Sequence, residues 1–271
     1  MNAQSLLMIM NIILILMVMI LIVYYQKKIA QLQRLNKSLV KANKNYLDML
    51  GFVSHELKGI MGSVIMCVYS VRDGFLGMMN FHQRKALDAV VRNLERLETT
   101  VKNYLDLSRI EKGELNVQKK EVILSEIMTQ VKDTFIKPMA EKEMILEDKI
   151  PGDLKIFADP NQIMTVFNNL LSNAIKYGHK GGRIILDYQK KEELLRFSVY
   201  NDGQSISQKE KDDLFKKFYR ASNGENKRVS GTGLGLFITK TIIESHGGQI
   251  WLISRKSGNE FNFEIKKRRV L

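Results

Sequence analysis

The chain has 271 residues, enough for one or two compact domains and some additional segments. Its formal net charge of +13 predicts an anionic partner, and a membrane surface or a nucleoside triphosphate fits this charge best. We find no helix-turn-helix, zinc or base-stacking pattern, so we predict no nucleic-acid partner. The single cysteine, Cys67, excludes disulfides and a cysteine-ligated zinc, and its place on an apolar helix seam predicts a small core residue.

The first predicted element is a transmembrane helix at residues 1–25. From residue 6 to residue 25 the only polar side chain is Asn11, and these twenty positions span about 30 Å as a helix, the thickness of a bilayer core. A cleaved signal peptide is the alternative, but no basic residue precedes the run and no Ala-x-Ala site follows it. We therefore expect membrane lipid as a partner of this segment.

The positive charge after the apolar run predicts the orientation. No Lys or Arg precedes the run, and basic residues follow it directly, at Lys27, Lys28, Arg34, Lys37, Lys41 and Lys44. By the positive-inside rule, everything after Tyr25 lies in the cytoplasm and only a short N-terminal stub lies outside. The sequence therefore predicts a single-pass protein of the inner (plasma) membrane.

Residues 26–50 are predicted to continue the helix as a coiled-coil linker. No proline occurs before Pro138, so the helix can run on from the membrane through His55. Apolar residues recur in alternating steps of three and four, and Asn36 and Asn43 take inward positions, as in coiled-coil dimers where a buried asparagine fixes the register. A loose polar linker is the alternative. The seam consists of Ile29, Leu32, Asn36, Leu39, Asn43, Tyr46, Leu50, Val53, Leu57, Ile60, Val64 and Cys67.

The same seam places His55 on the outside of the helix. With Leu50 and Val53 at inward positions, His55 takes the outward f position of the heptad. An imidazole in water is largely neutral and nucleophilic near pH 7. Glu56 lies beside it and is able to orient the ring or take its proton. A solvated histidine without a chemical role is the alternative.

A second helix is predicted to complete a hairpin over residues 51–112. The first helix is expected to end near Asp73-Gly74, and Asn80 with Gln83 forms a capping box that opens the second helix. Two such helices cannot cover both of their apolar stripes. We therefore expect two chains to pair as a homodimeric four-helix bundle with His55 on its outside. The seam of the second helix is Leu87, Val90, Leu94, Leu97, Val101 and Tyr104.

Residues 113–271 predict a two-layer α/β sandwich. Strands are expected at 114–117, 154–157, 183–189, 194–200, 249–254 and 261–266. Helices are expected at 124–140, from Asp159-Pro160 to about Tyr177, in a short segment capped by Ser207 and Glu210, and from about Gly233. Helices interleaved with largely antiparallel strands make the whole chain an α+β multi-domain protein.

Three features of this last domain predict a nucleotide site. Asn169 and Asn173 lie one helical turn apart on one face, where amide oxygens can ligate a Mg²⁺ ion that keeps waters and phosphate oxygens. Asn201-Asp202-Gly203 ends a strand in a tight turn, where an acceptor can meet a purine amine. Residues 231–236, Gly-Thr-Gly-Leu-Gly-Leu, allow backbone amides to approach phosphates at a helix N-terminus. Two of these features have a simpler alternative when taken alone: the two asparagines could be ordinary surface residues, and the turn could be an ordinary hairpin or Asx turn.

The ordered set resembles the sensor histidine kinases of two-component systems. Ser54-His55-Glu56-Leu57 resembles their H box, and the three features above, with Phe215 and Phe218, resemble their N, G1, F and G2 boxes in the same order. The likeness covers residues 50–266. It implies a dimerisation and histidine phosphotransfer domain at 51–112 and a catalytic ATP-binding domain at 113–271, with the Bergerat (GHKL) fold shared by gyrase and Hsp90.

The resemblance also implies roles for single residues. His55 would accept the phosphoryl group of Mg·ATP, Glu56 would act as the base, and Asn173 would ligate Mg²⁺ with support from Asn169. The phosphoryl group would then pass to an aspartate of a cognate response regulator. The segment between Tyr219 and Gly231 would be a mobile ATP lid. Residues implied to bind ATP are Asn169, Asn173, Lys176, Tyr177, Asn201, Asp202, Gly203, Phe215, Phe218, Arg220, Gly231, Thr232, Gly233, Leu234, Gly235 and Leu236.

Two departures from the family pattern alter these expectations. The family usually has Arg/Lys-Thr-Pro after His-Glu-Leu, where this chain has Lys58-Gly59-Ile60. In the family, the Thr or Asn one turn past the histidine holds the water that dephosphorylates the regulator. Gly59 has no such group, so we expect weak or no phosphatase activity. The family usually has Asp-Asn-Gly where Asn201 and Asp202 stand, so either residue is a candidate for the adenine contact.

Two other functions fit parts of the pattern. A pseudokinase scaffold would be anchored and dimeric but inactive, and its sign would be loss of His55 or Asn173, which are both present. An ATPase of the gyrase and Hsp90 type would use the same sandwich but has no use for the Ser-His-Glu-Leu helix. We therefore expect a membrane-anchored, ATP-dependent protein histidine kinase with its catalytic part in the cytoplasm.

Overall fold

The computed structural model of the chain describes residues 3–75, 77–220 and 231–267. Contacts divide the chain into two units, one up to Val53 and one from Ser54 onward. Residues 221–230, which make up most of the expected ATP lid, lie outside the described residues.

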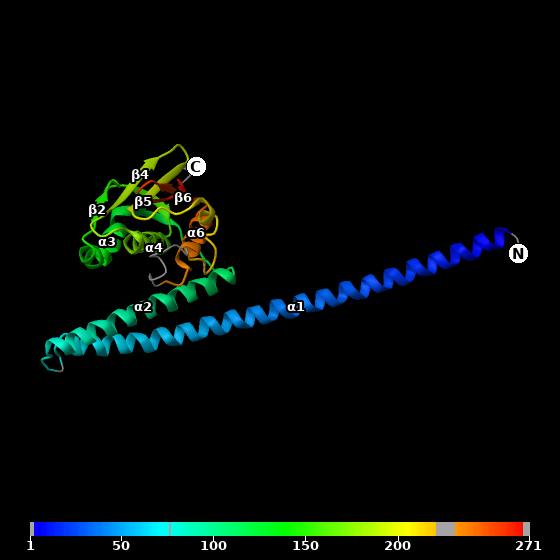
Figure 1. The fold of residues 1–271 in the computed structure, drawn as a ribbon, viewed down its shortest axis with the longest axis horizontal. Helices are drawn as coiled ribbons and strands as arrows, with labels where there is room; N and C mark the ends of the chain where they lie inside the picture. The colour runs from blue at the N-terminus through cyan, green and yellow to red at the C-terminus, as the bar shows by residue number, and fades with distance from the viewer. Residues whose placement is uncertain (1–2, 76, 221–230, 268–271) are drawn as a thin grey trace. The chain divides into compact units, whose positions relative to one another are not determined.

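α1, Ala3–Arg72, is a single helix of 70 residues (Figure 1). This confirms the prediction that helix continues without a break through His55. The helix also ends where the sequence predicts. Gly74 follows it with a φ of +86°, a left-handed conformation that glycine adopts without strain.

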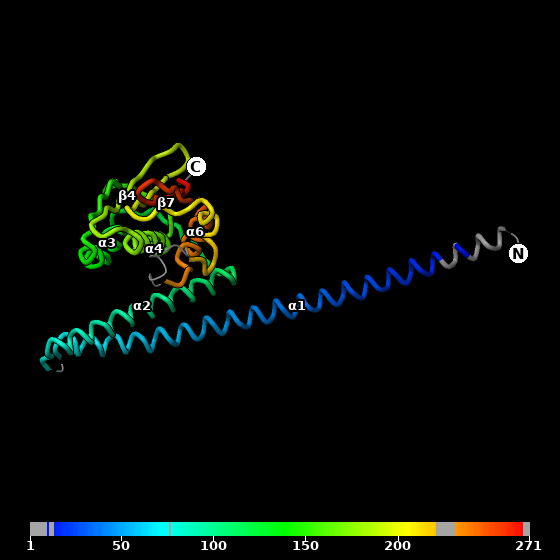
Figure 2. The backbone as a smooth tube through the Cα atoms, viewed as in Figure 1, coloured from blue at the N-terminus to red at the C-terminus, as the bar shows by residue number. Residues whose placement is uncertain are grey.

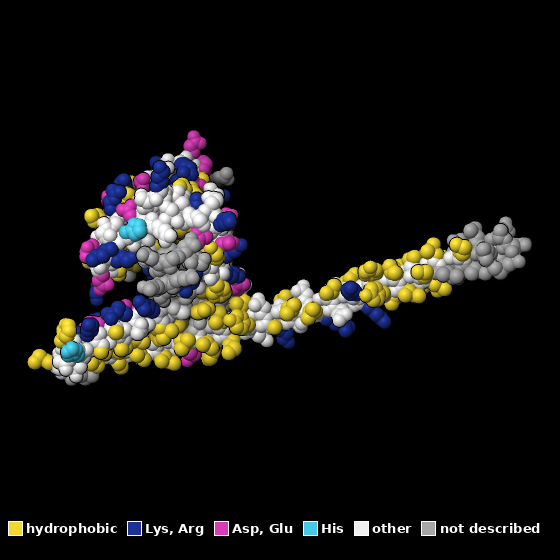
Figure 3. All heavy atoms as spheres, in the orientation of Figure 1, with side chains coloured by type: hydrophobic (Ala, Val, Ile, Leu, Met, Phe, Trp, Pro, Cys, Tyr) yellow, Lys and Arg dark blue, Asp and Glu magenta, His cyan; other side chains and the backbone are white. Residues whose placement is uncertain are grey.

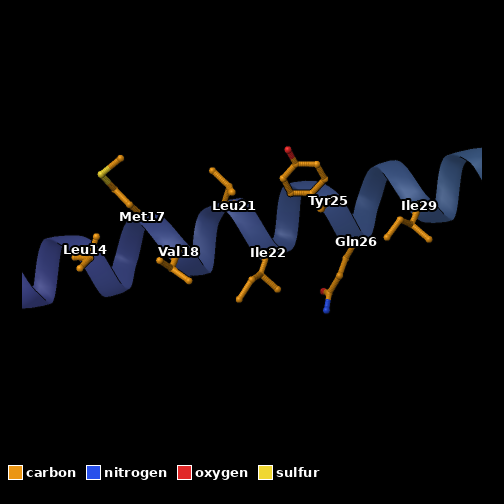
Figure 4. A pocket seen from close by; sticks show the side chains of 8 residues that line it. All are labelled: Leu14, Met17, Val18, Leu21, Ile22, Tyr25, Gln26 and Ile29. Carbon is orange, nitrogen blue, oxygen red and sulfur yellow. The ribbon is translucent and has the colours of Figure 1, made fainter.

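The N-terminal part of α1 exposes apolar side chains. From Leu14 to Tyr25 they are 50–68% exposed, and Figure 3 shows hydrophobic side chains along this stretch. In the part of the chain that the structure describes, α1 is the one helix long and apolar enough to cross a membrane. A shallow hollow on its surface is formed by α1 side chains alone and is apolar apart from Tyr25 and Gln26 (Figure 4). Such a surface suits lipid tails and offers little to a polar ligand.

α2, Phe81–Glu111, opens with the expected capping box. The Asn80 side chain accepts a hydrogen bond from Gln83 N, and the Gln83 side chain accepts one from Asn80 N, both at 2.9 Å. Across the hairpin, the hydroxyl of Tyr69 on α1 donates to Glu95 Oε1 on α2 at 3.3 Å. The capping box thus fixes where α2 begins, and the hairpin forms as predicted.

The apolar residues of the hairpin divide between two faces. Met61 of α1 and Val91 and Val101 of α2 are buried. Predicted seam residues that are still 38–61% exposed are Leu57, Ile60, Val64, Val90 and Leu97. Cys67 is exposed as well, so its prediction as a core residue is wrong for the single chain. The reason is that, within a single chain, α1 and α2 cover only one face of each other.

The remainder of the second unit is an α/β sandwich built on a five-stranded sheet. β2 pairs with β4 in parallel, and the other neighbours pair antiparallel. The strands, in their order across the sheet, are β2 (Ile145–Asp148), β4 (Arg183–Lys190), β5 (Leu194–Asp202), β7 (Gly258–Lys266) and β6 (Gln249–Arg255). A separate antiparallel pair consists of β1 (Lys120–Ile123) and β3 (Lys155–Ala158).

The helices of the sandwich lie on one side of the sheet, with α4 in contact with α3, α6 and β5 (Figure 2). Phe167 of α4 packs edge-on against Phe197 of β5 and Phe263 of β7, with ring centroids 6.0 and 5.5 Å apart. All three rings are at most 1% exposed and form the centre of the core. The helices are α3 (Leu124–Glu141), α4 (Pro160–Tyr177), α5 (Gln208–Lys211) and α6 (Gly235–Ser245).

The sequence pattern fails at two strands. The strand expected at 114–117 is wrong, because this backbone turns, with Asn116 N donating to Glu114 O at 2.8 Å, and the strand forms later as β1. Next to it, Gln118 N donates to Asp159 Oδ2 at 3.0 Å, so the segment joins the start of α4 and not a sheet. The sequence pattern does not predict β2, because its four residues do not alternate between apolar and polar. This strand depends on parallel pairing with β4.

A buried histidine connects the end of α6 to the start of α4. His246 is 3% exposed, and its Nε2 accepts a hydrogen bond from Asp159 N at 3.1 Å. Its Nδ1 lies 2.8 Å from Ile242 O, so the ring is held as the neutral tautomer with its proton on Nδ1. Burial lowers the pKa of His246 below its usual value, against the opposing effect of the bond to Ile242.

This lowered pKa predicts a loss of stability in mild acid. The histidine of the unfolded chain binds a proton near pH 6.5, whereas folded His246 binds one only at lower pH. Between these two pH values the unfolded state binds more protons than the folded state. The free energy of unfolding therefore falls as the pH drops from about 7.5 to 5.5. Trp251 in β6 is the only tryptophan and reports unfolding of this domain. In urea titrations followed by its fluorescence, we expect the midpoint to fall over this pH range, and to fall less in His246→Gln. Equal pH dependence in both proteins would contradict the prediction.

Candidate functional site

A cavity of about 480 Å³ lies beside α4 in the second unit. Its walls come from the C-terminal half of α4, the ends of α3 and β5, the start of β7, the segment before α6, and one side of α2. The fold brings together stretches that are far apart in sequence. The predicted site residues that line the cavity are Asn169, Asn173, Lys176, Tyr177, Asn201, Arg220, Gly231, Thr232, Gly233, Gly235 and Leu236.

The two asparagines of α4 differ in their contacts. Asn169 donates through Nδ2 to Gly235 O at 3.1 Å and to Thr239 Oγ1 at 3.2 Å, so its amide nitrogen is tied to the first turn of α6. Asn173, one turn further along, lines the cavity with a side chain that bonds to none of the described residues. Both amide oxygens are therefore left for a ligand.

Lys176 and Tyr177 form the last turn of α4. Lys176 keeps contact with solvent, but desolvation at the cavity wall, and then the positive charge of Arg96 on α2, lower its pKa. Burial raises the pKa of Tyr177, which outweighs the opposing charge of Arg220 and keeps the phenol neutral. The cationic side chains gathered here favour an anionic group in this part of the cavity.

Asn201 and Asp202 at the end of β5 are equal candidates for the adenine contact by sequence, but the structure places them differently. Asn201 is 2% exposed, lines the cavity and donates through Nδ2 to Asp202 O at 3.2 Å, which leaves its Oδ1 as an acceptor. Asp202 lies outside the cavity wall, and its carboxylate accepts from Tyr200 Oη at 2.7 Å and from Arg183 N at 2.9 Å. Burial alone would raise the pKa of Asp202, but these hydrogen bonds and the Arg183 charge hold it below its usual value.

Two glycines join the ends of α4 and β5. Gly203 forms an isolated antiparallel bridge with Gly178, the residue that follows α4. A Cβ on Gly203 would lie 2.5 Å from Tyr177 O, and one on Gly178 would lie 2.6 Å from Ala174 O. Gly203 therefore shapes the site by close backbone approach and does not itself line the cavity.

The glycine-rich segment before α6 has both open and packed positions. Gly233 has a φ of +72°, and a Cβ there would lie 2.7 Å from the carbonyl carbon of Phe218, so only glycine fits. Thr232 Oγ1 accepts from Leu234 N at 3.3 Å. Leu234, which is also predicted to bind ATP, is completely buried in the core, and its side chain does not line the cavity.

The two phenylalanines expected to bind nucleotide also lie outside the cavity wall. Phe215 packs on the core, edge-on to Phe261 with centroids 6.5 Å apart. Phe218 is 55% exposed and has a φ of +61°. Leu214 and Tyr219 line the cavity instead. The chain here forms successive turns beyond α5, so helical spacing does not predict which side chains face inward.

The sequence pattern also missed the wall that α2 contributes. Asn103 Nδ2 donates to Thr232 Oγ1 at 3.3 Å across the cavity rim. These residues occupy the polar side of a helix, and that spacing by itself indicates only a solvated face. The α2 residues that line the cavity are Arg92, Glu95, Arg96, Thr99, Thr100 and Asn103.

Amide oxygens are the metal donors that this cavity offers. Among the described residues, no group of three or more His, Cys, Asp or Glu side chains could hold a metal. The oxygens of Asn169 and Asn173 are few and neutral, which fits Mg²⁺, because this ion usually keeps several waters and takes its remaining ligands from substrate phosphates.

His55 and Glu56 lie on α1 with side chains that are 82% and 59% exposed. This exposure confirms the outward position that the heptad pattern predicts for His55. Nδ1 of His55 lies 3.7 Å from Glu56 Oε1, which is beyond hydrogen-bond distance. A small side-chain rotation would let Glu56 accept the Nδ1 proton and leave the lone pair on Nε2, where it can act as a nucleophile.

Comparisons with known proteins find relatives of this chain. Residues 158–269 match the family described as histidine kinase-, DNA gyrase B- and HSP90-like ATPase. The chain is 31% identical over 216 residues to the circadian input-output histidine kinase CikA of Synechococcus elongatus, covering 79% of this chain and 29% of CikA. It is 27% identical over 213 residues to the sensor histidine kinase WalK of Bacillus subtilis, covering 78% of this chain and 35% of WalK. The chain thus spans about a third of the length of these relatives.

A solved structure shows the same fold over most of the chain. The histidine kinase ThkA, crystallised in complex with the response regulator protein TrrA, is similar with a TM-score of 0.52 and 28% identity, covering 82% of this chain and 61% of that chain. The sandwich therefore has the ATP-binding α/β fold of these kinases.

Proposed function

We propose, on the premise that the chain belongs to the sensor histidine kinase family, that it transfers the γ-phosphoryl group of ATP to His55 and then to an aspartate of a response regulator. The cavity beside α4 carries this proposal. It collects amide, cationic and backbone groups that suit a nucleotide, in a chain that also presents an exposed histidine and glutamate pair.

Different groups in the cavity suit the adenine and the phosphates of ATP. Asn201, with its amide oxygen left as acceptor, would receive a hydrogen bond from the adenine amine. Lys176 and Arg220, with the amides of the glycine-rich segment, would hold the phosphates. Tyr177, whose phenol is kept neutral by burial, lines the same cavity. Binding of this kind positions the nucleotide, which is most of what phosphoryl transfer requires of a protein.

His55 and Glu56 divide the chemistry of transfer between them. Nε2 of His55 forms the new bond to phosphorus as the bond from phosphorus to the bridging oxygen of ADP breaks. The Nδ1 proton then passes to Glu56, whose carboxylate lies 3.7 Å from that nitrogen. In the second step, an aspartate of the regulator takes the phosphoryl group from Nε2, and Glu56 returns its proton to Nδ1, so that His55 becomes neutral imidazole again.

Asn173 and Asn169 are the residues that would hold Mg²⁺. When bound, the ion neutralises charge on the phosphate oxygens. Asn169 keeps its orientation through the bonds from Nδ2 to Gly235 O and Thr239 Oγ1, so its oxygen stays toward the cavity side of α4.

We assign the partners from exposed surfaces. The half-exposed apolar residues of the hairpin, such as Leu57 and Val90, fit a second copy of the chain, since two hairpins paired as a four-helix bundle would bury them. The apolar stretch up to Tyr25 fits membrane lipid and would be a single-pass anchor, with residues 26–50 as the linker, 51–112 as the dimerisation domain and 113–271 as the ATP-binding domain. A response regulator is the partner seen with ThkA.

The first prediction is that His55 is the phosphorylated residue. When the full chain in detergent micelles is incubated with γ-labelled ATP and Mg²⁺, we expect acid-labile label in the wild type and none in His55→Gln. His82→Gln removes another exposed histidine and should label normally. ATP binding should survive in His55→Gln, since His55 is not in the cavity wall. Acid-stable label, or label in His55→Gln, would show that His55 is not the phosphorylated residue.

The second prediction assigns the adenine contact. Asn201→Ala removes the acceptor in the cavity and should weaken ATP binding about tenfold, which corresponds to loss of one buried hydrogen bond. Asp202→Ala should affect binding less, because its carboxylate bonds to Tyr200 and Arg183. Asn201→Asp should tighten binding through a charge-assisted hydrogen bond. Isothermal titration of the full chain measures all three, and a larger loss in Asp202→Ala than in Asn201→Ala would reverse the assignment.

The third prediction concerns the reverse reaction. Gly59 offers no group to hold a water, so the wild type should dephosphorylate its phosphorylated regulator slowly in the presence of ADP. A Cβ on Gly59 or on Gly62 meets no atom within 4 Å, so a threonine fits at either position. Gly59→Thr should accelerate dephosphorylation, and Gly62→Thr, the matched control, should not. Rapid dephosphorylation by the wild type would refute the idea.

A further inference from the structure

Lys142, at the C-terminal end of α3, directs its ammonium group to the C-terminal end of α4. Its Nζ donates to Ile175 O at 2.6 Å, to Lys176 O at 3.0 Å and to Gly178 O at 2.9 Å. An ammonium group has three protons, so these three carbonyls use all of its donors. Burial lowers the pKa of Lys142, as expected for an ammonium withdrawn from water.

The end of α4 needs such a donor. The last four carbonyls of a helix have no partner within the helix, and they carry the negative end of the helix dipole. Here Gly178 N bonds back to Ala174 O, and the ammonium takes the next two helix carbonyls and that of Gly178 itself. A cation at this position satisfies hydrogen bonds and the dipole together.

The carbonyls that accept hydrogen bonds from Lys142 belong to the turn of α4 whose side chains line the cavity. Lys176 and Tyr177 line the cavity from this turn. Gly178 continues into the bridge with Gly203, two residues after Asn201. The backbone of Lys142 bonds to the same region, because Gly181 N donates to Lys142 O at 2.9 Å.

We propose that Lys142 is a positioning residue for nucleotide binding, which keeps the last turn of α4 and the end of β5 in the arrangement that places Lys176, Tyr177 and Asn201 in the cavity. The inference rests on the proposed function of the cavity. Lys142 does not line the cavity and acts through the backbone of α4.

The test measures ADP binding to the full chain in detergent micelles by isothermal titration. Lys142→Met keeps the length of the side chain and removes its donors, and should weaken binding about tenfold. Lys142→Arg keeps a cation with several donors and should restore most of the affinity. The matched control is Lys180→Met: Lys180 pairs with Glu143 in the same region, its side chain is 67% exposed, and its loss should leave affinity unchanged.

A double-mutant cycle separates positioning from general loss of stability. In a Lys176→Ala, Tyr177→Ala background, the last turn of α4 lacks both of its cavity side chains, and of the side chains through which Lys142 acts only Asn201 remains. There, adding Lys142→Met should weaken binding at most about twofold, because contributions that act through one another are not additive. If Lys142→Met does not fold, Lys142→Gln, which keeps two donors, takes its place in the cycle.

Each outcome decides a different claim. A wild type that does not bind ADP overturns the proposed function of the cavity and the inference with it. A wild type that binds ADP, with unchanged affinity in Lys142→Met, overturns the inference alone. The same tenfold loss in both backgrounds also overturns it, because Lys142 would then act by general destabilisation.

Discussion

Side-chain hydrogen bonds satisfy backbone groups at both ends of α4, and two of these side chains, His246 and Lys142, come from the ends of other helices. A helix leaves unpaired amides at its start and unpaired carbonyls at its end. At the start, Asp159 caps two amides of the first turn, and His246 from the end of α6 accepts the amide of Asp159 itself. At the end, the ammonium of Lys142 takes the carbonyls. Between the two ends, Phe167 anchors α4 to the sheet through aromatic packing.

This support explains why the cavity can be polar. Asn169, Asn173 and Lys176 lie on the side of α4 that does not face the sheet, so the core can hold the helix while these side chains stay available. Asn169 is fixed in turn by the first turn of α6. The apolar core and the hydrogen bonds at the helix ends therefore hold α4 in place, and the amide oxygens of Asn169 and Asn173 are left for a ligand.

In the hairpin of α1 and α2, some apolar residues are buried within the chain and others stay exposed. The hairpin buries residues such as Met61 and Val101 within one chain and leaves Ile60 and Leu97 exposed. One set of apolar residues therefore holds the hairpin, and the other is available for association. His55 belongs to neither set, since its side chain is 82% exposed. Its side chain thus takes no part in the packing that holds the helix, as the proposed role of His55 requires.

Local patterns in the sequence determined much of this protein. The length of α1 follows from a run without proline, the start of α2 from the capping box of Asn80 and Gln83, and the start of α4 from Asp159-Pro160. The outward position of His55 follows from heptad spacing alone. Each of these features depends on residues within one or two helical turns, so the sequence carries the whole signal.

Only the tertiary structure decided which residues of each motif meet in the cavity. Asn201 and Asp202 are neighbours in one turn, and the hydrogen bonds from Tyr200 and Arg183 keep Asp202 out of the cavity. Leu234 and Phe215 belong to the motifs but pack into the core, while Arg96 and Lys142 belong to no motif and take their places through the packing of separate helices. The same holds for β2, which exists because β4 pairs with it. Such contacts join residues that are far apart in the chain, and local spacing carries no information about them.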